Sequence, residues 1–263
     1  MSLSDAGYDP VNAKKRARAI VRALRRAYPG ARTSLHYEDP FQLLVATILS
    51  AQSTDETVNR VAPKLFAKYP TAAKLAAAKP ADVEKIIYPT GFFRQKTKSI
   101  VGAARKITED FGGEVPLTIA ELTTLPGVAR KTANVVITNL APQAEGIFVD
   151  THIRRVSQRL ALTANTDPVK IERDLMDLLP RSAWVDTPHQ MILLGRGPCN
   201  ARNPDHASCP LLRWCPTGQA ALAGQAPPRS VRRAAGVQPS GRAKPTRGRR
   251  TSGDTSTGRL RRT

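Results

Sequence analysis

The sequence predicts an all-α protein of two domains, and three observations support this prediction. Residues 12 to 28 place apolar side chains at intervals of three and four, which is the periodicity of an amphipathic helix. Capping residues, Pro and Gly divide the following chain into further segments of helical length. No alternation of apolar and polar residues, the pattern of a half-buried strand, interrupts the region from 54 to 89. The length of 263 residues allows one large domain or two modest ones.

The first two helices are expected at residues 12 to 28 and 39 to 49. Lys and Arg interleave with the apolar residues of the first helix, so we expect it to pack one face and expose a basic one. In the second, Asp39 is a typical N-cap and Pro40 suits the first turn. The residues that follow are so apolar that this helix is expected to lie in the core.

A junction follows at Ser50-Ala51-Gln52. We predict that Ser53 and Glu56 form a capping box, in which each side chain bonds to a backbone amide of the other, and that this box starts the third helix. Gln52 would then lie between two helices. A side chain in that position is free to point into a groove, although polar residues also populate ordinary turns.

Three more helices are expected at residues 54 to 68, 71 to 78 and 81 to 88, because Pro residues separate them. Pro63 lies inside the first of these and is expected to break or kink it. The next helix, at 95 to 111, should end at Gly112-Gly113, a pair typical of helix C-caps.

Thr90 to Lys96 forms a candidate site before that helix, because two phenylalanines there lie next to cations. We expect one of Phe92 and Phe93 to be buried and the other to remain exposed.

The segment from Leu125 to Val136 is organised as helix, hairpin and helix. Thr118 and Glu121 predict a capping box for a short first helix, and Pro126-Gly127 breaks the chain. From Ala129 onward the chain is built of good helix formers. The unpaired amides at such a turn suit a phosphate, and Gly127 allows a close approach. Lys131 would lie beside this phosphate clamp.

Asp150 precedes the next predicted helix, which starts at Thr151. An Asp at this position is ordinarily an N-cap. The same geometry would also hold its carboxylate at the mouth of a cleft that faces Lys131. Further helices are predicted from Asp167 to Leu179 and near 188 to 195.

Composition restricts the partner of this protein. A formal net charge of +20 and a pI near 10.7 favour binding to a polyanion. No run of about 18 apolar residues is present, which predicts that the chain does not span a membrane. The N-terminus carries Asp5 and Asp9 and lacks an apolar signal core, so we expect a soluble intracellular protein. We also expect it to act as a monomer in the cytoplasm.

Three cysteines, Cys199, Cys209 and Cys215, lie within seventeen residues of one another (199 to 215). This clustering makes a disulfide framework improbable and indicates a metal or cluster site.

Two sequences, Leu125-Pro-Gly-Val-Ala-Arg-Lys131 and Val149-Asp-Thr-His152, resemble the helix-hairpin-helix DNA glycosylases related to endonuclease III. The resemblance covers about residues 12 to 216 and implies damaged double-stranded DNA as the partner. It also implies that Lys131 is the nucleophile and Asp150 the second catalytic residue. Ala129 departs from the family, which usually has a second Gly there, so we expect the backbone to approach a phosphate less closely at this point.

The resemblance further implies a six-helix domain at 33 to 144 and a second domain that joins residues 1 to 32 with 145 to 216. Gln52 would fill the gap left by a flipped-out base, and Phe92 falls where relatives place a leucine wedge. Further DNA contacts are expected at Leu125, Gly127, Val128, Ala129, Arg130 and His152.

The cysteine loop of this family has the spacing C-x6-C-x2-C-x5-C, and here His206 stands at the second position. The resemblance therefore implies a [4Fe-4S] cluster held by Cys199, Cys209, Cys215 and His206. Iron-sulfur clusters normally use four thiolates, though imidazole replaces thiolate in some. A three-iron cluster without His206, a tetrahedral zinc, or a site emptied by loss of the fourth thiolate remain as alternatives.

The function implied by the resemblance is base excision repair by a bifunctional DNA glycosylase and abasic-site lyase that removes oxidised pyrimidines. The amine of Lys131 must be partly neutral to react, which a desolvated, cation-lined cleft would favour. One alternative is an adenine mismatch glycosylase, but relatives of that kind carry a catalytic Glu where this chain has Thr47, and they lack the hairpin lysine. A noncatalytic helix-hairpin-helix binding module is the other.

Residues 217 to 263 are predicted to form a disordered basic tail. Pro, Gly, Ser, Thr, Ala and Arg dominate this stretch, which has eleven Lys or Arg and one Asp. A tail of net charge +10 (11 − 1) would add nonspecific contacts to DNA phosphates.

Overall fold

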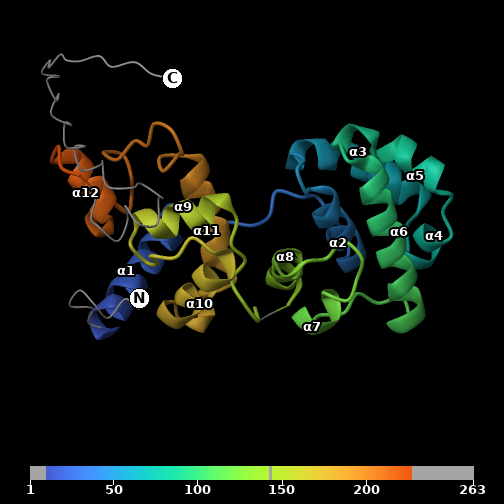
Figure 1. The fold of residues 1–263 in the computed structure, drawn as a ribbon, viewed down its shortest axis with the longest axis horizontal. Coiled ribbons are helices and arrows are strands. Elements are labelled where there is room, and N and C mark those ends of the chain that lie inside the picture. The colour runs from blue at the N-terminus through green and yellow to red at the C-terminus, as the bar shows by residue number, and fades with distance from the viewer. Residues whose placement is uncertain (1–9, 142–143, 227–263) are drawn as a thin grey trace, which may run out of the picture.

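The computed structural model describes residues 10–141 and 144–226, and every regular element in these ranges is a helix, as predicted. Two lobes lie side by side along the longest axis, with α8 between them (Figure 1). No helix in the described ranges is long and apolar enough to cross a membrane. The elements are α1 (Pro10–Ala27), α2 (Pro40–Leu49), α3 (Asp55–Lys68), α4 (Ala72–Ala76), α5 (Pro80–Ile87), η2 (Tyr88–Thr90), α6 (Phe93–Asp110), α7 (Ile119–Leu122), α8 (Arg130–Leu140), α9 (Thr151–Arg159), α10 (Pro168–Leu178), η3 (Arg181–Ala183), α11 (Asp186–Arg196), η4 (Leu212–Trp214) and α12 (Pro216–Leu222).

Each lobe has its own hydrophobic core. The first core is formed by α2 through α8, with Leu44, Leu65 and Ile100 fully buried in it. The second joins α1 to the helices after residue 144, so that Ile20 packs in the same cluster as Ile153. The N-terminal helix therefore belongs with the C-terminal half of the chain (Figure 1). The chain passes between the lobes before α2 and after α8, and the functional site lies at these crossings.

The helix boundaries follow from local capping. Asp39 accepts a hydrogen bond from the Gln42 amide at 2.8 Å, and Thr118 accepts one from the Glu121 amide at 3.2 Å, as the sequence predicts. The α6 helix ends where Gly113, with φ +90°, donates its amide to the Ile107 carbonyl at 3.0 Å. Such caps satisfy backbone groups that a helix leaves unpaired at its ends.

The structure corrects the predicted cap of α3 and excludes a break at Pro63. Thr54, not Ser53, is the N-cap, and its side chain accepts a hydrogen bond from the Thr57 amide at 3.2 Å. The junction after α2 is therefore one residue longer than expected. Pro63 lies inside α3, which runs without interruption from Asp55 to Lys68. Tertiary packing of the helix on the first core outweighs the local preference of Pro for a break.

The predicted disordered tail begins too early at residue 217, because helix α12 covers Pro216–Leu222. Thr217 donates its hydroxyl to the Arg159 carbonyl at 2.8 Å, and the Cys215 sulfur accepts the Gly218 amide at 3.3 Å. These contacts fasten α12 to α9 and to the cysteine loop, and composition alone does not reveal them. Most of the predicted tail, residues 227 to 263, lies outside the described residues.

Candidate active site

A pocket of about 390 Å³ lies between the two lobes. Lys131, in the first turn of α8, and Asp150, directly before α9, both line it. Gln52 from the junction after α2 lines the same pocket. The fold thus brings the two predicted catalytic residues and the predicted gap-filling glutamine to one cavity.

The hairpin before Lys131 depends on Gly127, whose φ of +80° lies in the region that side chains disfavour. A Cβ at this position would lie 2.6 Å from Cβ of Ser99 on α6. Any side chain there would push the hairpin away from α6 and displace the start of α8. Close packing inside the protein is therefore a requirement at Gly127, in addition to the predicted approach of a ligand.

The start of α8 is open to an anion. Ala129 is the N-cap residue, and its side chain makes no capping hydrogen bond. The first amides of the helix are then free to bind a phosphate, which the positive end of the helix dipole also favours. Ala129 has φ −84° and ψ 167°, an extended conformation that any residue adopts, so the departure from Gly causes no backbone strain here.

Lys131 is exposed in the free protein. The desolvated cleft expected from the sequence is therefore absent before DNA binds, and the water around this amine has to be displaced by the substrate itself. The pocket does carry the expected cations, because Arg32 and Arg196 both line it.

Asp150 is both an N-cap and a pocket residue. Its Oδ1 accepts a hydrogen bond from the Ile153 amide at 2.7 Å, which starts α9 and fixes the carboxylate. Among the described residues, Oδ2 has no hydrogen-bond partner, so one oxygen remains for proton transfer or charge stabilisation. The capping bond orients the group that the chemistry needs.

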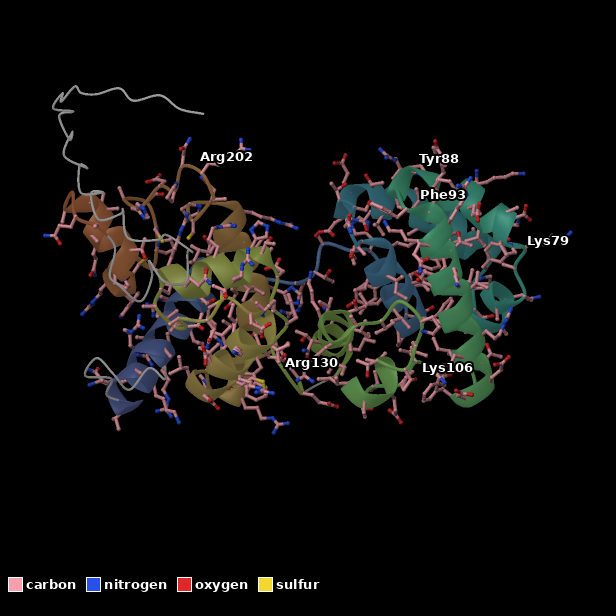
Figure 2. All side chains as sticks on the ribbon, viewed as in Figure 1. Lys79, Tyr88, Phe93, Lys106, Arg130 and Arg202 are labelled. Atoms are coloured by element: carbon pink, nitrogen blue, oxygen red, sulfur yellow. The ribbon has the colours of Figure 1, made fainter. Side chains whose placement is uncertain are left out.

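The predicted gap-filling residue, Gln52, and the predicted wedge, Phe92, share an unusual backbone conformation. Gln52 has φ +54° and Phe92 has φ +45°, and both side chains are exposed. A left-handed conformation costs a residue with a side chain about 1 to 2 kcal/mol, and such strain gathers at functional sites. Phe93, by contrast, packs on the Tyr88 ring with centroids 4.9 Å apart (Figure 2). Phe92 remains exposed as expected, whereas Phe93 is only partly buried instead of fully buried.

Phe92→Ala is expected to slow base release from duplex DNA more than strand cleavage at a preformed abasic site. The Phe92 side chain is 66% exposed and is not part of the described core, so its loss should not disturb the fold. A wedge is needed to break base stacking in intact duplex DNA, and less so at an abasic site, where the base is already absent. Single-turnover rates on the two substrates measure the difference, with Phe93→Ala as a control that should instead lower the melting temperature. Equal losses on both substrates would contradict a wedge.

Several predicted DNA-contact residues do not line the pocket. The side chains of Leu125 and Val128 are buried and support the hairpin from inside. Arg130 forms two hydrogen bonds to the buried Glu172, at 2.9 and 3.1 Å, and so ties α8 to α10 between the lobes (Figure 2). His152 faces Arg155 instead of the pocket, with its Nδ1 3.1 Å from Nη2 of that residue.

The cysteine loop lies in the second lobe, away from the pocket. Burial, and then the charges of the other cysteines, raise the pKa of Cys209 and of Cys215. The three thiols therefore lie in the same part of the second lobe. Arg159 holds the loop through the carbonyls of Cys199 and Asn200, at 3.2 and 2.7 Å, and lies 3.4 Å from the Cys199 sulfur.

His206 lies next to the cysteines. A Cβ on Gly218 would lie 3.2 Å from the His206 Nδ1 and 3.5 Å from the Cys215 sulfur, so both groups face one small space that a side chain would fill. Within residues 10–141 and 144–226, no three His, Cys, Asp or Glu side chains are close enough to hold a single metal ion.

Comparison with known proteins identifies the family. Residues 45–181 match the family described as "HhH-GPD superfamily base excision DNA repair protein". Endonuclease III of Synechocystis sp. is 54% identical over 207 residues, which are 79% of this chain and 94% of that protein. Endonuclease III of Bacillus subtilis is 44% identical over 73% of this chain and 88% of that protein. The chain belongs to the endonuclease III family. It is a base excision repair enzyme, a DNA glycosylase and abasic-site lyase.

Two solved endonuclease III structures superpose on this chain, each with a TM-score of 0.74. Each superposition covers 80% of this chain and 98% of the solved chain. One, 37% identical, is a non-covalent endonuclease III-DNA complex, and the other, 38% identical, is a trapped endonuclease III-DNA covalent intermediate.

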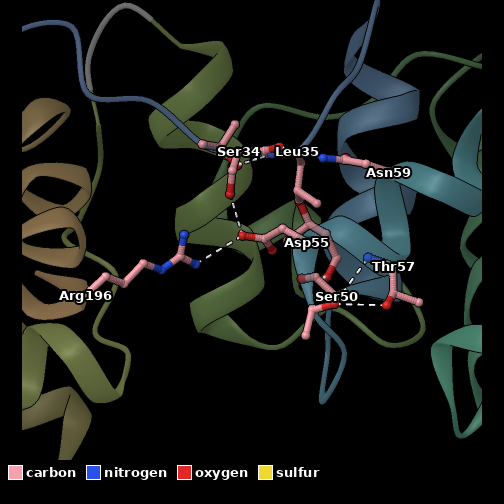
Figure 3. A network of polar contacts seen from close by, with 10 residues as sticks. Ser34, Leu35, Ser50, Asp55, Thr57, Asn59 and Arg196 are labelled. Carbon is pink, nitrogen blue, oxygen red and sulfur yellow. Dashed lines mark hydrogen bonds and ion pairs between the residues drawn. The ribbon is translucent and has the colours of Figure 1, made fainter. Parts of the chain in front are cut away.

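A polar link across the endonuclease III cleft was not predicted from the sequence. Arg196 of α11 reaches Asp55 at the start of α3, with 3.2 Å between Nη2 and Oδ2, and Ser34 donates its hydroxyl to the same carboxylate (Figure 3). All three residues line the pocket. The link joins two residues that are 141 positions apart in the sequence, so no local sequence pattern predicts it.

His189 is the second unpredicted residue of this endonuclease III pocket. It lines the pocket but is only 5% exposed, and its Nε2 is buried without a hydrogen-bond partner. The ring packs edge to face on Phe148, with centroids 5.3 Å apart. Burial lowers the pKa of His189 from 6.5 to about 4, so the imidazole is neutral at pH 7.

Acidification is expected to destabilise the wild type more than a His189→Phe variant. The unfolded chain binds a proton at this His below pH 6.5, whereas the folded chain accepts it only near pH 4, so stability is lost as pH falls through that window. At pH 4, the wild type should have lost roughly 3 kcal/mol more of its free energy of unfolding than the His189→Phe variant. Urea unfolding of both proteins at pH 7.5 and pH 4 measures it, and parallel losses in both would contradict a buried neutral His.

Proposed function

We propose that this protein excises oxidised pyrimidines from damaged duplex DNA and then cuts the strand at the resulting abasic site. The observation that carries the proposal is the shared pocket of Lys131 and Asp150, which pairs a nucleophilic amine with a carboxylate that its cap holds in place. A pocket of about 390 Å³ between the lobes can receive a base only if the base leaves the stack.

The chemistry follows from these two groups. The neutral amine of Lys131 attacks C1′ of the deoxyribose, the bond from C1′ to the base nitrogen breaks, and the base leaves with the bonding electrons and takes up a proton. Asp150 accepts the proton that the amine loses or stabilises positive charge on the sugar. The sugar ring opens to a Schiff base with Lys131. Removal of a proton from C2′ then expels the 3′ phosphate by β-elimination.

DNA would lie across both lobes, with a phosphate at the hairpin of Gly127, Val128 and Ala129. The Gly127 and Ala129 amides would bind it, because the Val128 amide already donates to the Leu125 carbonyl at 3.1 Å. Gln52 would occupy the space of the flipped base, and Phe92 would enter the stack beside it. Leu125, Arg130 and His152 remain proposed contacts, of which Leu125 could contribute only through its backbone because its side chain is buried. The basic tail would add phosphate contacts that are independent of sequence. We further propose that the enzyme acts as a monomer in the cytoplasm, where it has access to the chromosome.

Structural observations argue against both alternatives. An adenine mismatch glycosylase needs a carboxylate where this chain has Thr47, and Thr47 lines the pocket while donating its hydroxyl to the Leu43 carbonyl at 2.7 Å. A noncatalytic binding module would have no use for Lys131 and Asp150 in one pocket.

The proposal is tested with a panel of duplexes that each contain one lesion. Base release and strand cleavage are scored separately on thymine glycol, an oxidised cytosine, an abasic site and an adenine mismatch. Release of the oxidised pyrimidines together with cleavage supports the proposal. Release of adenine alone, or binding without release, would overturn it.

We also propose a [4Fe-4S] cluster in the cysteine loop, held by Cys199, Cys209, Cys215 and His206. The grouping of three cysteines in one loop and the position of the His206 Nδ1 beside the Cys215 sulfur support this ligand set. A bound cluster would be redox active and would fix the loop. The loop is already braced by Arg159, so we assign the cluster no step in base excision.

His206→Cys is expected to lower the reduction potential of the bound cluster. A thiolate in place of a neutral imidazole makes the cluster more negative, which disfavours adding an electron. Voltammetry and iron analysis of protein purified without oxygen measure the effect, with the exposed His36→Cys as a control that should change neither. Zinc without iron, or an unchanged potential, would contradict the assignment of His206 as a ligand.

A further inference from the structure

His189 occupies a position in the pocket that neither the proposed nucleophile nor the proposed acid-base group explains. It projects from α11 into the wall that also contains Phe148 and Asp150. The ring is 95% buried (100 − 5), yet its Nε2 has no partner among the described residues. Phenylalanine would fill similar space without burying an unpaired nitrogen, which is a costly arrangement in a folded protein.

Two polar groups on the α2 side of the pocket are already used in the free protein. On the α2 wall, Thr47 and Ser50 donate their hydroxyls to carbonyls of their own helix, at 2.7 and 2.8 Å, and so present only acceptor lone pairs. Lys131 and Asp150 are needed at the sugar. His189 adds a buried nitrogen without a hydrogen-bond partner among the described residues, beside a pocket sized for a base.

A neutral imidazole has one N–H donor and one acceptor nitrogen. The Watson-Crick edge of a pyrimidine presents carbonyl oxygens and a ring nitrogen, so it offers both complementary groups. A charged imidazole would lose its acceptor, and burial keeps this ring neutral. An aromatic ring packed on Phe148 also limits how the imidazole can turn, so the nitrogen is held in a defined place.

We propose that His189 is a specificity-determining residue that reads the flipped base, through a hydrogen bond between its neutral imidazole and the polar edge of an oxidised pyrimidine. This inference rests on the proposed function. It also separates the two reactions of the enzyme, because an abasic site carries no base. His189 should matter for base release and should not matter for elimination at a preformed abasic site.

The test compares His189→Phe with wild type in full-length, cluster-loaded protein. One duplex carries a single thymine glycol, and a matched duplex carries an abasic site at the same position. We expect base release to fall about tenfold or more, the effect of losing one hydrogen bond in a polar site. Cleavage of the abasic duplex should stay within about twofold, and the melting temperature should be equal to or higher than that of wild type.

Two further variants sharpen the comparison. Gln190→Leu also removes a buried, unpaired oxygen from α11, but Gln190 does not line the pocket, so neither activity should change. His189→Gln places an amide near the position of Nε2 and should restore part of the base release. Each result is the ratio of base release to abasic-site cleavage within one preparation. Partial unfolding lowers both activities together, so it would leave this ratio unchanged.

Equal losses on both duplexes would overturn the proposal and indicate that His189 acts by positioning Asp150 or Lys131. An unchanged ratio, or a glutamine variant no better than phenylalanine, would also overturn it. Failure of the wild type to release thymine glycol while it cleaves abasic DNA would instead refute the proposed function, so the two failures are distinguishable.

Discussion

Lys131→Gln is expected to abolish base release through amine attack, with no covalent adduct on borohydride treatment. Glutamine is polar and only one atom shorter than lysine, so it suits this exposed position in α8, but it lacks the nucleophilic amine. Binding should persist, because the hairpin amides and the basic surface are unchanged. Single-turnover base release, borohydride trapping and a salt-dependent binding assay measure the three parts of this expectation.

Lys98→Gln provides a matched control. Lys98 is an exposed lysine of α6 that does not line the pocket, so its loss should leave trapping intact. Persistent trapping in Lys131→Gln would assign the nucleophile to another amine, whereas loss of DNA binding together with activity would indicate a misfolded hairpin.

Asp150→Asn should slow base release by about 10² to 10⁴ with binding retained, the usual loss when a positioned acid-base group is removed. Asn is as good an N-cap as Asp, so the amide of Ile153 keeps its partner and the melting temperature should change little. The substitution therefore separates the catalytic role of the carboxylate from its capping role.

Asp167→Asn is the corresponding control, because Asp167 caps α10 by accepting the Lys170 amide at 3.0 Å and lies outside the pocket. Near-normal turnover in Asp150→Asn would show that the residue is only a cap. A large fall in its melting temperature would mean that the lost rate reports unfolding.

Features that depend on short stretches of chain were predictable from the sequence. Asp39, Thr118 and Asp167 cap helices where their positions suggest, because N-capping involves residues only two or three apart. The Gly127 turn follows from its local sequence as well. The choice of Ser53 over Thr54 was wrong, since two adjacent hydroxyl residues offer nearly equal caps and the packing of α3 decides between them.

Features that depend on distant parts of the chain could not be read from local patterns. Arg196 meets Asp55, and Arg130 meets Glu172, only after the two lobes have formed. His189 looks like an ordinary helix residue in the sequence, and its importance comes from burial beside the pocket. The helix α12 is a similar case, because its contacts with α9 and the cysteine loop stabilise a stretch whose composition favours disorder.

The central claim is that Lys131 forms the covalent bond to DNA from within the pocket between the lobes. Borohydride reduction of the complex with abasic DNA, followed by digestion and mass spectrometry, locates the attached deoxyribose on a single peptide. The account predicts the adduct on Lys131. An adduct on any other lysine or on the N-terminal amine would contradict it.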